Sequence, residues 1–276
     1  MIINEEMAVT YLDRLDVSRY CKEWYFSETE TAKIVGESIF TSPNTDDETR
    51  KKVRSVYDAI HATVRIFQPL NVRLWNLLFP DWKKELENVS VDLIVGFPEP
   101  NDATVEYDAD GRCHIIFDLV CWTKYIGYCD MAQLARNLLS HELCHVLLHS
   151  HLAGLTEALE GADYQKRLDA ITFDEGFAHL LSYDAKDIDM VDWQSKELLT
   201  VFGQSREKLK SALAEQDTTK QGQFIYEALY GNYYDKFACM CGMLYLAALW
   251  LEGGDIAIKT ALNEGYMDFA GKAAGQ

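Results

Sequence analysis

Apolar side chains recur at every third or fourth position between residues 131 and 147. This spacing places them along one side of an α-helix. Asp130 precedes the pattern as a candidate N-cap, and neither proline nor glycine occurs in residues 130–151, so nothing in the local sequence ends the helix early. The pattern therefore predicts one uninterrupted helix across these residues.

A different pattern lies upstream of this helix. Three segments, at residues 89–97, 103–107 and 112–119, are rich in β-branched and aromatic side chains and are separated by residues that favour turns. They predict a small sheet that contains antiparallel strands. Helical patterns dominate before and after the sheet. We therefore expect an α+β protein, with a helical region at residues 1–88 and a second region at 89–276, packed together as one compact unit.

The helical patterns on either side of the sheet also predict individual elements. Apolar periodicity, polar clusters and the positions of proline and glycine set their approximate ends. They predict helices at residues 47–67, 72–86, 236–251 and 256–262, and a polar break at 217–222.

Composition narrows the classes of partner and the compartment. The formal net charge of -18 argues against nucleic acid and anionic membranes, since both bind basic surfaces. The first 20 residues carry acids and no long apolar core, unlike a signal peptide, and the apolar run at 237–251 is shorter than the roughly 18 residues of a membrane span. Seven cysteines occur without a Cys-x-x-Cys pair, which favours free thiols in a reducing cytoplasm.

The chemistry of the chain centres on the predicted helix at 130–151, which contains the motif His141-Glu142-Leu143-Cys144-His145. Two histidines four residues apart share one face of a helix, so their imidazoles can bind one zinc ion, while Glu142 can act as general base on a water molecule. The alternative is a buried helix whose histidines satisfy each other, which is costly without a partner. Cys144 points away from the histidine face.

A zinc site that performs hydrolysis usually has three protein ligands. Glu175 lies in a second predicted helix at residues 173–181, whereas Glu157 and Glu160 lie in a polar connecting stretch. A packed helix holds a ligand more firmly than a polar connection does, which favours Glu175 and leaves the other two as alternatives. His149, four residues beyond His145 on the same face, is a further candidate ligand. A position outside the ligands or at the helix end is favoured, because the helix carries it one turn away from the metal.

The pairing of H-E-L-C-H with D-E-G-F-A-H-L-L resembles the gluzincins, zinc peptidases with an HExxH helix and a ligand glutamate on the next helix. The E-G-F-A run is especially similar to the aminopeptidase N group. The resemblance implies a zincin-like fold and one zinc ion bound by His141, His145 and Glu175, with Asp174 where that group has asparagine. The chain departs from thermolysin-like gluzincins at His179, where they have an aspartate that orients a ligand imidazole.

The resemblance also implies a residue that stabilises the oxyanion. Tyr234-Asp235-Lys236 is similar to the Y-E-K element that supplies this tyrosine in the aminopeptidase N group, although Phe237 replaces the glycine that follows. Tyr234 is therefore the first candidate, and Tyr230 and Tyr233 are alternatives.

Together these features predict a zinc metallopeptidase that acts on a peptide or protein substrate. The strand at 112–118 is expected to lie along the cleft as an edge strand that pairs with the substrate, as in zincin-like folds. No G-x-M-E-N run occurs, so endopeptidase and aminopeptidase action both stay open. The alternative is a non-catalytic protein that binds a metal or a peptide. Glu142 argues against it, because a structural metal site does not need that carboxylate.

Overall fold

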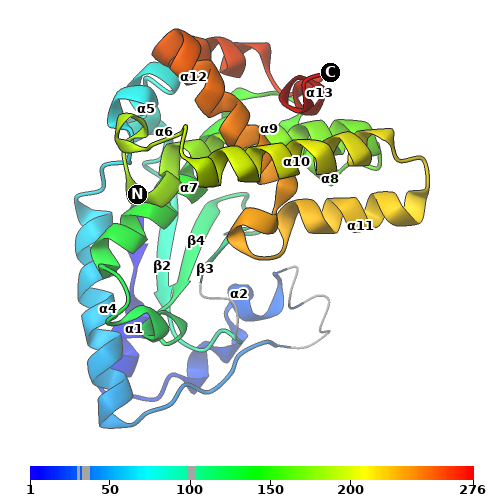
Figure 1. Ribbon diagram of the computed structural model, residues 1–276. Coiled ribbons are helices and arrows are strands. Elements are labelled where there is room, and N and C mark those ends of the chain that lie inside the picture. Colours follow the sequence, from blue (N-terminus) through cyan, green and yellow to red (C-terminus); the bar gives the residue numbers. More distant parts are fainter. Residues whose placement is uncertain (30–31, 33–37, 99–102) are drawn as a thin grey trace. The chain divides into compact units, whose positions relative to one another are not determined.

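The computed structural model describes residues 1–29, 32, 38–98 and 103–276, which are mainly helical with a small mixed sheet (Figure 1). The predicted α+β class is confirmed at this level. The chain forms two compact units, residues 1–68 with 83–136, and residues 69–82 with 137–276. The sheet thus shares a unit with the N-terminal helices, whereas the predicted division after residue 88 grouped it with the HExxH helix.

The sheet of the first unit has four strands within the described residues, in the order β1 (Ile2–Asn4), β2 (Ser90–Ile94), β4 (Cys113–Asp118) and β3 (Ala103–Tyr107). β1, β2 and β4 are parallel, and β3 is antiparallel to β4. Every residue of β2 and β4 is buried, as expected for interior strands with both faces covered. β1 was not predicted.

The position of β4 corrects one prediction. Residues 112–118 were expected to form an edge strand that pairs with a substrate backbone. β4 is instead paired on one side with β2, through partners such as Ser90 and His114, and on the other with β3, through Ala103 and Phe117. Its backbone hydrogen-bonding groups are therefore already used, and the edges of the sheet belong to β1 and β3.

The helices of the first unit follow ordinary amphipathic rules. In α4 (Asp47–Arg65), Val53, Val56, Ile60 and Val64 form one buried stripe, and the Asp46 carboxylate accepts a hydrogen bond from the Thr49 backbone N–H at 2.7 Å, which caps the helix. α4 and β2 both contact α1. Other short helices among the described residues of this unit are α1 (Glu6–Leu12), α2 (Trp24–Ser27) and the 3₁₀ helices Ser18–Lys22 and Cys121–Tyr125.

The regular elements of the second unit are all helices. Its elements are α5 (Val72–Leu78), most of α7 (Met131–His151), α8 (Leu155–Glu160), α9 (Tyr164–Ser182), α10 (Lys196–Ala214), α11 (Thr218–Leu229), α12 (Phe237–Glu264) and α13 (Phe269–Ala274), with 3₁₀ helices at Tyr183–Ala185, Ile188–Met190 and Tyr233–Asp235.

Two helical predictions needed correction. The predicted helix at 72–86 is divided into α5 and α6 (Trp82–Glu85), with Pro80 between them, because proline disfavours helical conformation in the residue before it. The predicted polar break at 217–222 is mostly helix, since the Asp217 carboxylate accepts hydrogen bonds from the backbone N–H groups of Thr219 and Lys220 at 2.9 and 3.1 Å. That cap starts α11 one residue later.

The central packing of the second unit is the contact between α9 and α12 (Figure 1). Both helices carry a glycine at the crossing. A Cβ atom placed on Gly242 would lie 2.0 Å from the carbonyl oxygen of Thr172, and one on Gly176 would lie 2.8 Å from the carbonyl carbon of Gly242. The two backbones therefore touch directly, which explains the glycine of the E-G-F-A run and holds α9 firmly in place.

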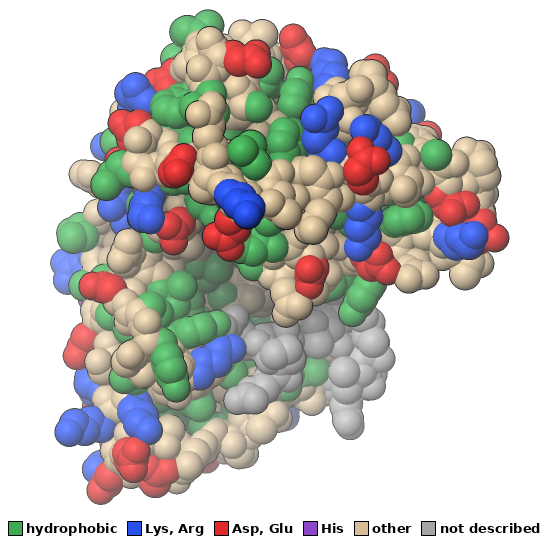
Figure 2. All heavy atoms as spheres, viewed as in Figure 1, with side chains coloured by type: hydrophobic (Ala, Val, Ile, Leu, Met, Phe, Trp, Pro, Cys, Tyr) green, Lys and Arg blue, Asp and Glu red, His purple; other side chains and the backbone are tan. Residues whose placement is uncertain are grey.

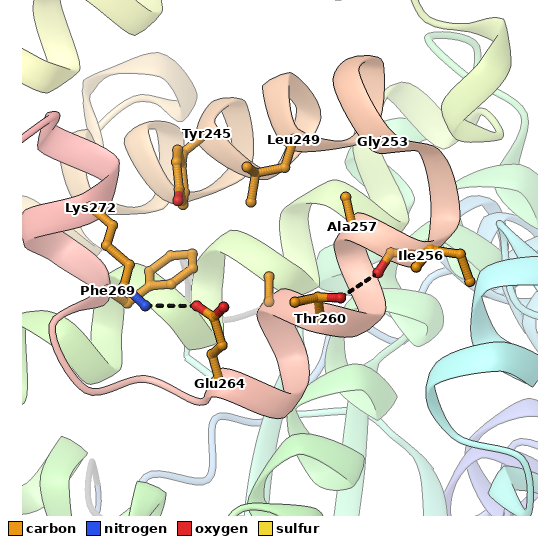
Figure 3. Close-up of a pocket in the computed structure, with 10 residues that line it drawn as sticks. Tyr245, Leu249, Gly253, Ile256, Ala257, Thr260, Glu264, Phe269 and Lys272 are labelled. Carbon is orange, nitrogen blue, oxygen red and sulfur yellow. Dashed lines mark hydrogen bonds and ion pairs between the residues drawn. The ribbon is translucent and has the colours of Figure 1, made fainter.

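α12 is longer than predicted, because the segments at 237–251 and 256–262 form one helix with a break at Gly254, where φ is 63°. By length and composition it could cross a membrane, but 56% of its most apolar window is buried inside the protein, as in a core helix. Its two halves and α13 line a pocket of about 340 Å³ (Figure 3). The pocket walls include Tyr245, Leu249 and Phe269, and Lys272 pairs with Glu264 at 2.7 Å beside them.

Charged side chains of both signs are mixed on the surface. On the face shown in Figure 2, lysine and arginine stand among aspartate and glutamate rather than gathering in one basic patch. All seven cysteines are free thiols, and Cys144, inside the HExxH motif, is fully buried.

Candidate metal centre

The helix predicted from residues 130–151 is present as α7, and it brings the two motif histidines together. The Asp130 carboxylate accepts a hydrogen bond from the Gln133 backbone N–H at 3.0 Å, so it caps α7 as predicted. His141 and His145 lie one turn apart on the same face, with their Nε2 atoms 3.1 Å from each other. Their side chains are mostly buried, at 17% and 15% exposure.

The outer nitrogen of each imidazole has a polar neighbour. His145 Nδ1 lies 2.8 Å from the Asp174 carboxylate. His141 Nδ1 lies 3.4 Å from the hydroxyl of Ser182, which donates its own proton to the Ala178 carbonyl and can therefore accept one from His141. Both contacts favour a proton on Nδ1 and a lone pair on Nε2.

Two lone pairs 3.1 Å apart repel each other unless a proton or a cation lies between them. Burial disfavours charge on His145, but the Asp174 carboxylate outweighs it and raises the pKa of His145 to about 10. A proton can therefore fill the gap when no metal is bound. A metal ion would satisfy both nitrogens at once, provided that further ligands converge on the same point.

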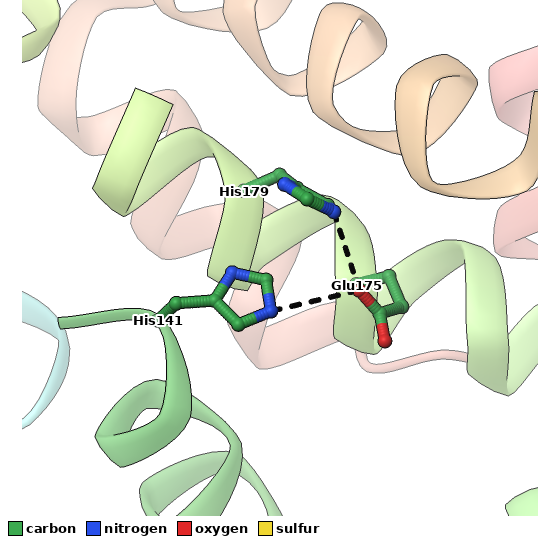
Figure 4. Close-up of side chains that lie close together, drawn as sticks. All are labelled: His141, Glu175 and His179. Carbon is green, nitrogen blue, oxygen red and sulfur yellow. Dashed lines mark ion pairs between the residues drawn. The ribbon is translucent and has the colours of Figure 1, made fainter. Parts of the chain in front are cut away.

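Glu175, on α9, provides such a further ligand. Its carboxylate oxygens lie 3.7 Å from His141 Nε2 and 3.9 Å from His145 Nε2 (Figure 4). Ligand atoms bound to one zinc at about 2.1 Å in a tetrahedron are about 3.4 Å apart, so these separations fit a single ion with small adjustments. The alternatives Glu157 and Glu160 are exposed on α8, and the possible metal clusters among the described residues contain neither.

Asp174 is the site residue whose role sequence reasoning missed. Its carboxylate contacts both His145 Nδ1 at 2.8 Å and His149 Nε2 at 3.3 Å. Burial raises the pKa of Asp174, but the neighbouring His145 outweighs that effect and holds the pKa well below its usual value. A carboxylate beside the outer nitrogen of a ligand histidine fixes the ring and raises its basicity. Asp174, the residue before Glu175, is therefore placed to hold the His145 ring from its outer side.

Replacing Asp174 with asparagine is expected to weaken zinc binding by about 10–100-fold, because the amide lacks the charge that supports His145. Zinc affinity, measured by competition with a chromophoric chelator, tests this. Asp163→Asn is a matched control on the same helix, since Asp163 caps α9 by accepting from Lys166 N–H and asparagine caps equally well. Unchanged affinity in the Asp174 variant would contradict the orienting role.

Glu142 follows His141 on α7 and is partly buried. Its pKa is raised to about 7, mainly by burial and also by the carboxylates of Glu175 and Asp174, while His145 and Lys236 act in the opposite direction. A carboxyl group with a pKa near neutrality can both accept and return a proton. A bound cation would lower this pKa.

The candidate tyrosines are placed differently from one another. The Tyr234 hydroxyl pairs with the Tyr183 hydroxyl at 2.8 Å, and Tyr230 stacks on Tyr226 with ring centroids 4.9 Å apart. Tyr233 is the one joined to a residue of the cluster, because its hydroxyl lies 3.3 Å from His179 Nδ1. The structure therefore links Tyr233 to the candidate metal site through His179, while Tyr234 as oxyanion stabiliser stays a prediction.

His149 lies next to Asp174, as noted above, and His179 lies next to Glu175, with its Nε2 atom 3.4 Å from the Glu175 carboxylate. These two histidines belong to two separate groups that could hold a metal ion: His179 groups with His141 and Glu175, and His149 groups with His145 and Asp174.

No protein-family model matches this chain, and neither a curated protein nor a solved structure matches it.

Proposed function

We propose that this protein is a zinc-dependent hydrolase, and specifically a peptidase of the gluzincin type with a zincin-like catalytic fold. The observation that carries the proposal is the convergence of His141 Nε2, His145 Nε2 and the Glu175 carboxylate within 3.1–3.9 Å of one another, with Glu142 beside them. The H-E-L-C-H and E-G-F-A sequences support it. The substrate would be a peptide or protein, and the protein would act in the cytoplasm.

The residues divide the chemistry in a simple way. A zinc ion held by His141, His145 and Glu175 would supply Lewis acidity toward water and a substrate carbonyl. Glu142 takes the proton that water loses as it attacks, and then delivers it to the leaving amine. A tyrosine hydroxyl, from Tyr234 or Tyr233, donates a hydrogen bond to the developing oxyanion.

The first test is metal content, measured by elemental mass spectrometry on protein purified without chelator or affinity-tag metal. We expect about one zinc per chain in the wild type, as a single three-ligand site requires, and loss of that zinc in Glu175→Ala. Glu160→Ala is the matched control, because Glu160 is an exposed glutamate on α8, and it should keep its zinc. A wild type that stays metal-free after zinc is added back would overturn the proposal.

One observation favours a second candidate, a protein that uses the metal only as a structural or binding element. Structural zinc sites close with a fourth protein ligand, and His179 lies close enough to Glu175 to be considered for that position. A cleavage assay of the zinc-loaded wild type on a broad peptide library distinguishes the two candidates. Cleavage of any peptide supports the hydrolase, and no cleavage supports the non-catalytic protein.

A further inference from the structure

His179 is a buried histidine whose inner nitrogen has no hydrogen-bond partner. It follows Glu175 by one turn of α9, and the residue is 6% exposed. Its Nε2 atom is among the buried side-chain nitrogens without a hydrogen-bond partner in the described part of the chain. A buried nitrogen without a hydrogen bond is unfavourable, so a further partner for this atom is expected.

His179 Nε2 faces the other residues of the candidate metal site. His179 Nε2 lies 3.4 Å from Glu175 Oε2, and the His179 ring centroid lies 4.7 Å from that of His141. Figure 4 shows His141 and His179 directed at the same carboxylate from two different helices. One candidate ligand atom from each of these three residues falls within a sphere suited to a single ion.

The outer nitrogen of His179 also has a neighbour that suits ligation. His179 Nδ1 lies 3.3 Å from the Tyr233 hydroxyl, which can accept a proton from it and leave the lone pair on Nε2.

We propose that His179 is a fourth protein ligand of the metal, so that the site holds three imidazoles and one carboxylate; this rests on the metal site of the proposed function. The ligands form two pairs with i,i+4 spacing, His141 with His145 on α7 and Glu175 with His179 on α9. The contacts measured among them run from 3.1 to 3.9 Å, around the 3.4 Å or so expected for ligands of one zinc.

The outer contacts of the three histidines strengthen the assignment. His141 has the Ser182 hydroxyl, His145 has the Asp174 carboxylate, and His179 has the Tyr233 hydroxyl. Ligand histidines almost always have such an outer partner. If His179 served only to fill the core, there would be no reason for its Nδ1 atom to contact the Tyr233 hydroxyl while its Nε2 atom faces the candidate metal site. Zinc accommodates four protein ligands and can expand to five, so the fourth ligand is compatible with hydrolysis.

The test is to count the imidazoles bound to zinc. X-ray absorption at the zinc edge should fit three imidazoles in the zinc-loaded wild type and two in His179→Ala. Zinc affinity, from chelator competition, should fall by about 100-fold or more, since loss of an outer partner alone costs about 10–100-fold. His151→Ala is the control, because His151 is an exposed histidine that also lies on α7, and its affinity should not change.

The fold of each variant is checked by thermal melting of the zinc-free protein, and His179→Gln replaces the alanine variant if that one does not fold. Unchanged affinity and an unchanged edge spectrum in a folded variant would overturn the fourth ligand and leave the hydrolase proposal standing. A wild type that binds no zinc would overturn both. Two imidazoles in the wild type, with Glu175 still required for binding, would overturn the fourth ligand alone.

Discussion

Replacing Glu142 with glutamine is expected to lower the rate of peptide cleavage by about 10²–10⁴-fold, the usual contribution of a general base, while one zinc per chain stays bound. Glutamine has the shape of glutamate but cannot accept the proton of the attacking water. Glu142 follows His141 directly and is not one of the three proposed ligands His141, His145 and Glu175, so the metal ligands should be unaffected. The measurement pairs kcat on a cleaved peptide with zinc content.

Glu157→Gln makes the same chemical change at an exposed position on α8 and should leave both kcat and zinc content at wild-type values. Turnover that survives in Glu142→Gln would remove Glu142 from the mechanism. Loss of zinc in that variant would instead make Glu142 part of the metal site. If the zinc-loaded wild type cleaves no peptide at all, the non-catalytic candidate replaces the hydrolase.

Replacing Gly242 with alanine is expected to destabilise the protein by about 3 kcal/mol or more, at or above the usual range for overpacking. The new Cβ atom would lie 2.0 Å from the Thr172 carbonyl oxygen, and a backbone atom cannot move aside as a flexible side chain can. α9 and α12 must separate to relieve the clash. Because α9 carries Glu175, zinc binding should weaken together with stability. Urea unfolding measures the first effect and chelator competition the second.

Gly203→Ala provides the matched control for this substitution. Gly203 lies inside α10, and a Cβ atom placed there meets nothing within 4 Å. Alanine is about 1 kcal/mol more favourable than glycine inside a helix, so this variant should be slightly more stable than the wild type. Equal effects of the two substitutions would show that the backbone contact between α9 and α12 is not what requires glycine at position 242.

Much of the site follows from local spacing. The intervals of three and four residues predicted α7, and the four-residue step between His141 and His145 predicted that their rings share one face. Both are properties of a single helix, and the pattern of side chains along the chain specifies them. The seven free cysteines and the mainly helical class with a small sheet were also predictable, because composition and local periodicity carry that information.

Other features required contacts between distant residues. β1 has three residues and pairs with a strand 88 positions later, so no local pattern identifies it. The interior position of β4 depends on two partners, β2 and β3, and the sequence of β4 cannot name them. The sequence suggested a metal ligand among the adjacent residues Asp174 and Glu175. It could not show which carboxylate faces His141 and His145 as a ligand and which contacts the outer nitrogen of His145, because that depends on how α9 is oriented about its own axis.

The sequence by itself therefore determined the helix that carries the HExxH motif and the shared face of its two histidines, because both depend on the backbone of one helix. Only the tertiary structure decided that Glu175, Asp174 and His179 meet those histidines. Their positions depend on how α9 is held within the unit, and that in turn depends on the backbone contact of Gly176 with Gly242. The packing of two helices across a glycine contact depends on both segments, so the sequence of either helix alone does not reveal it.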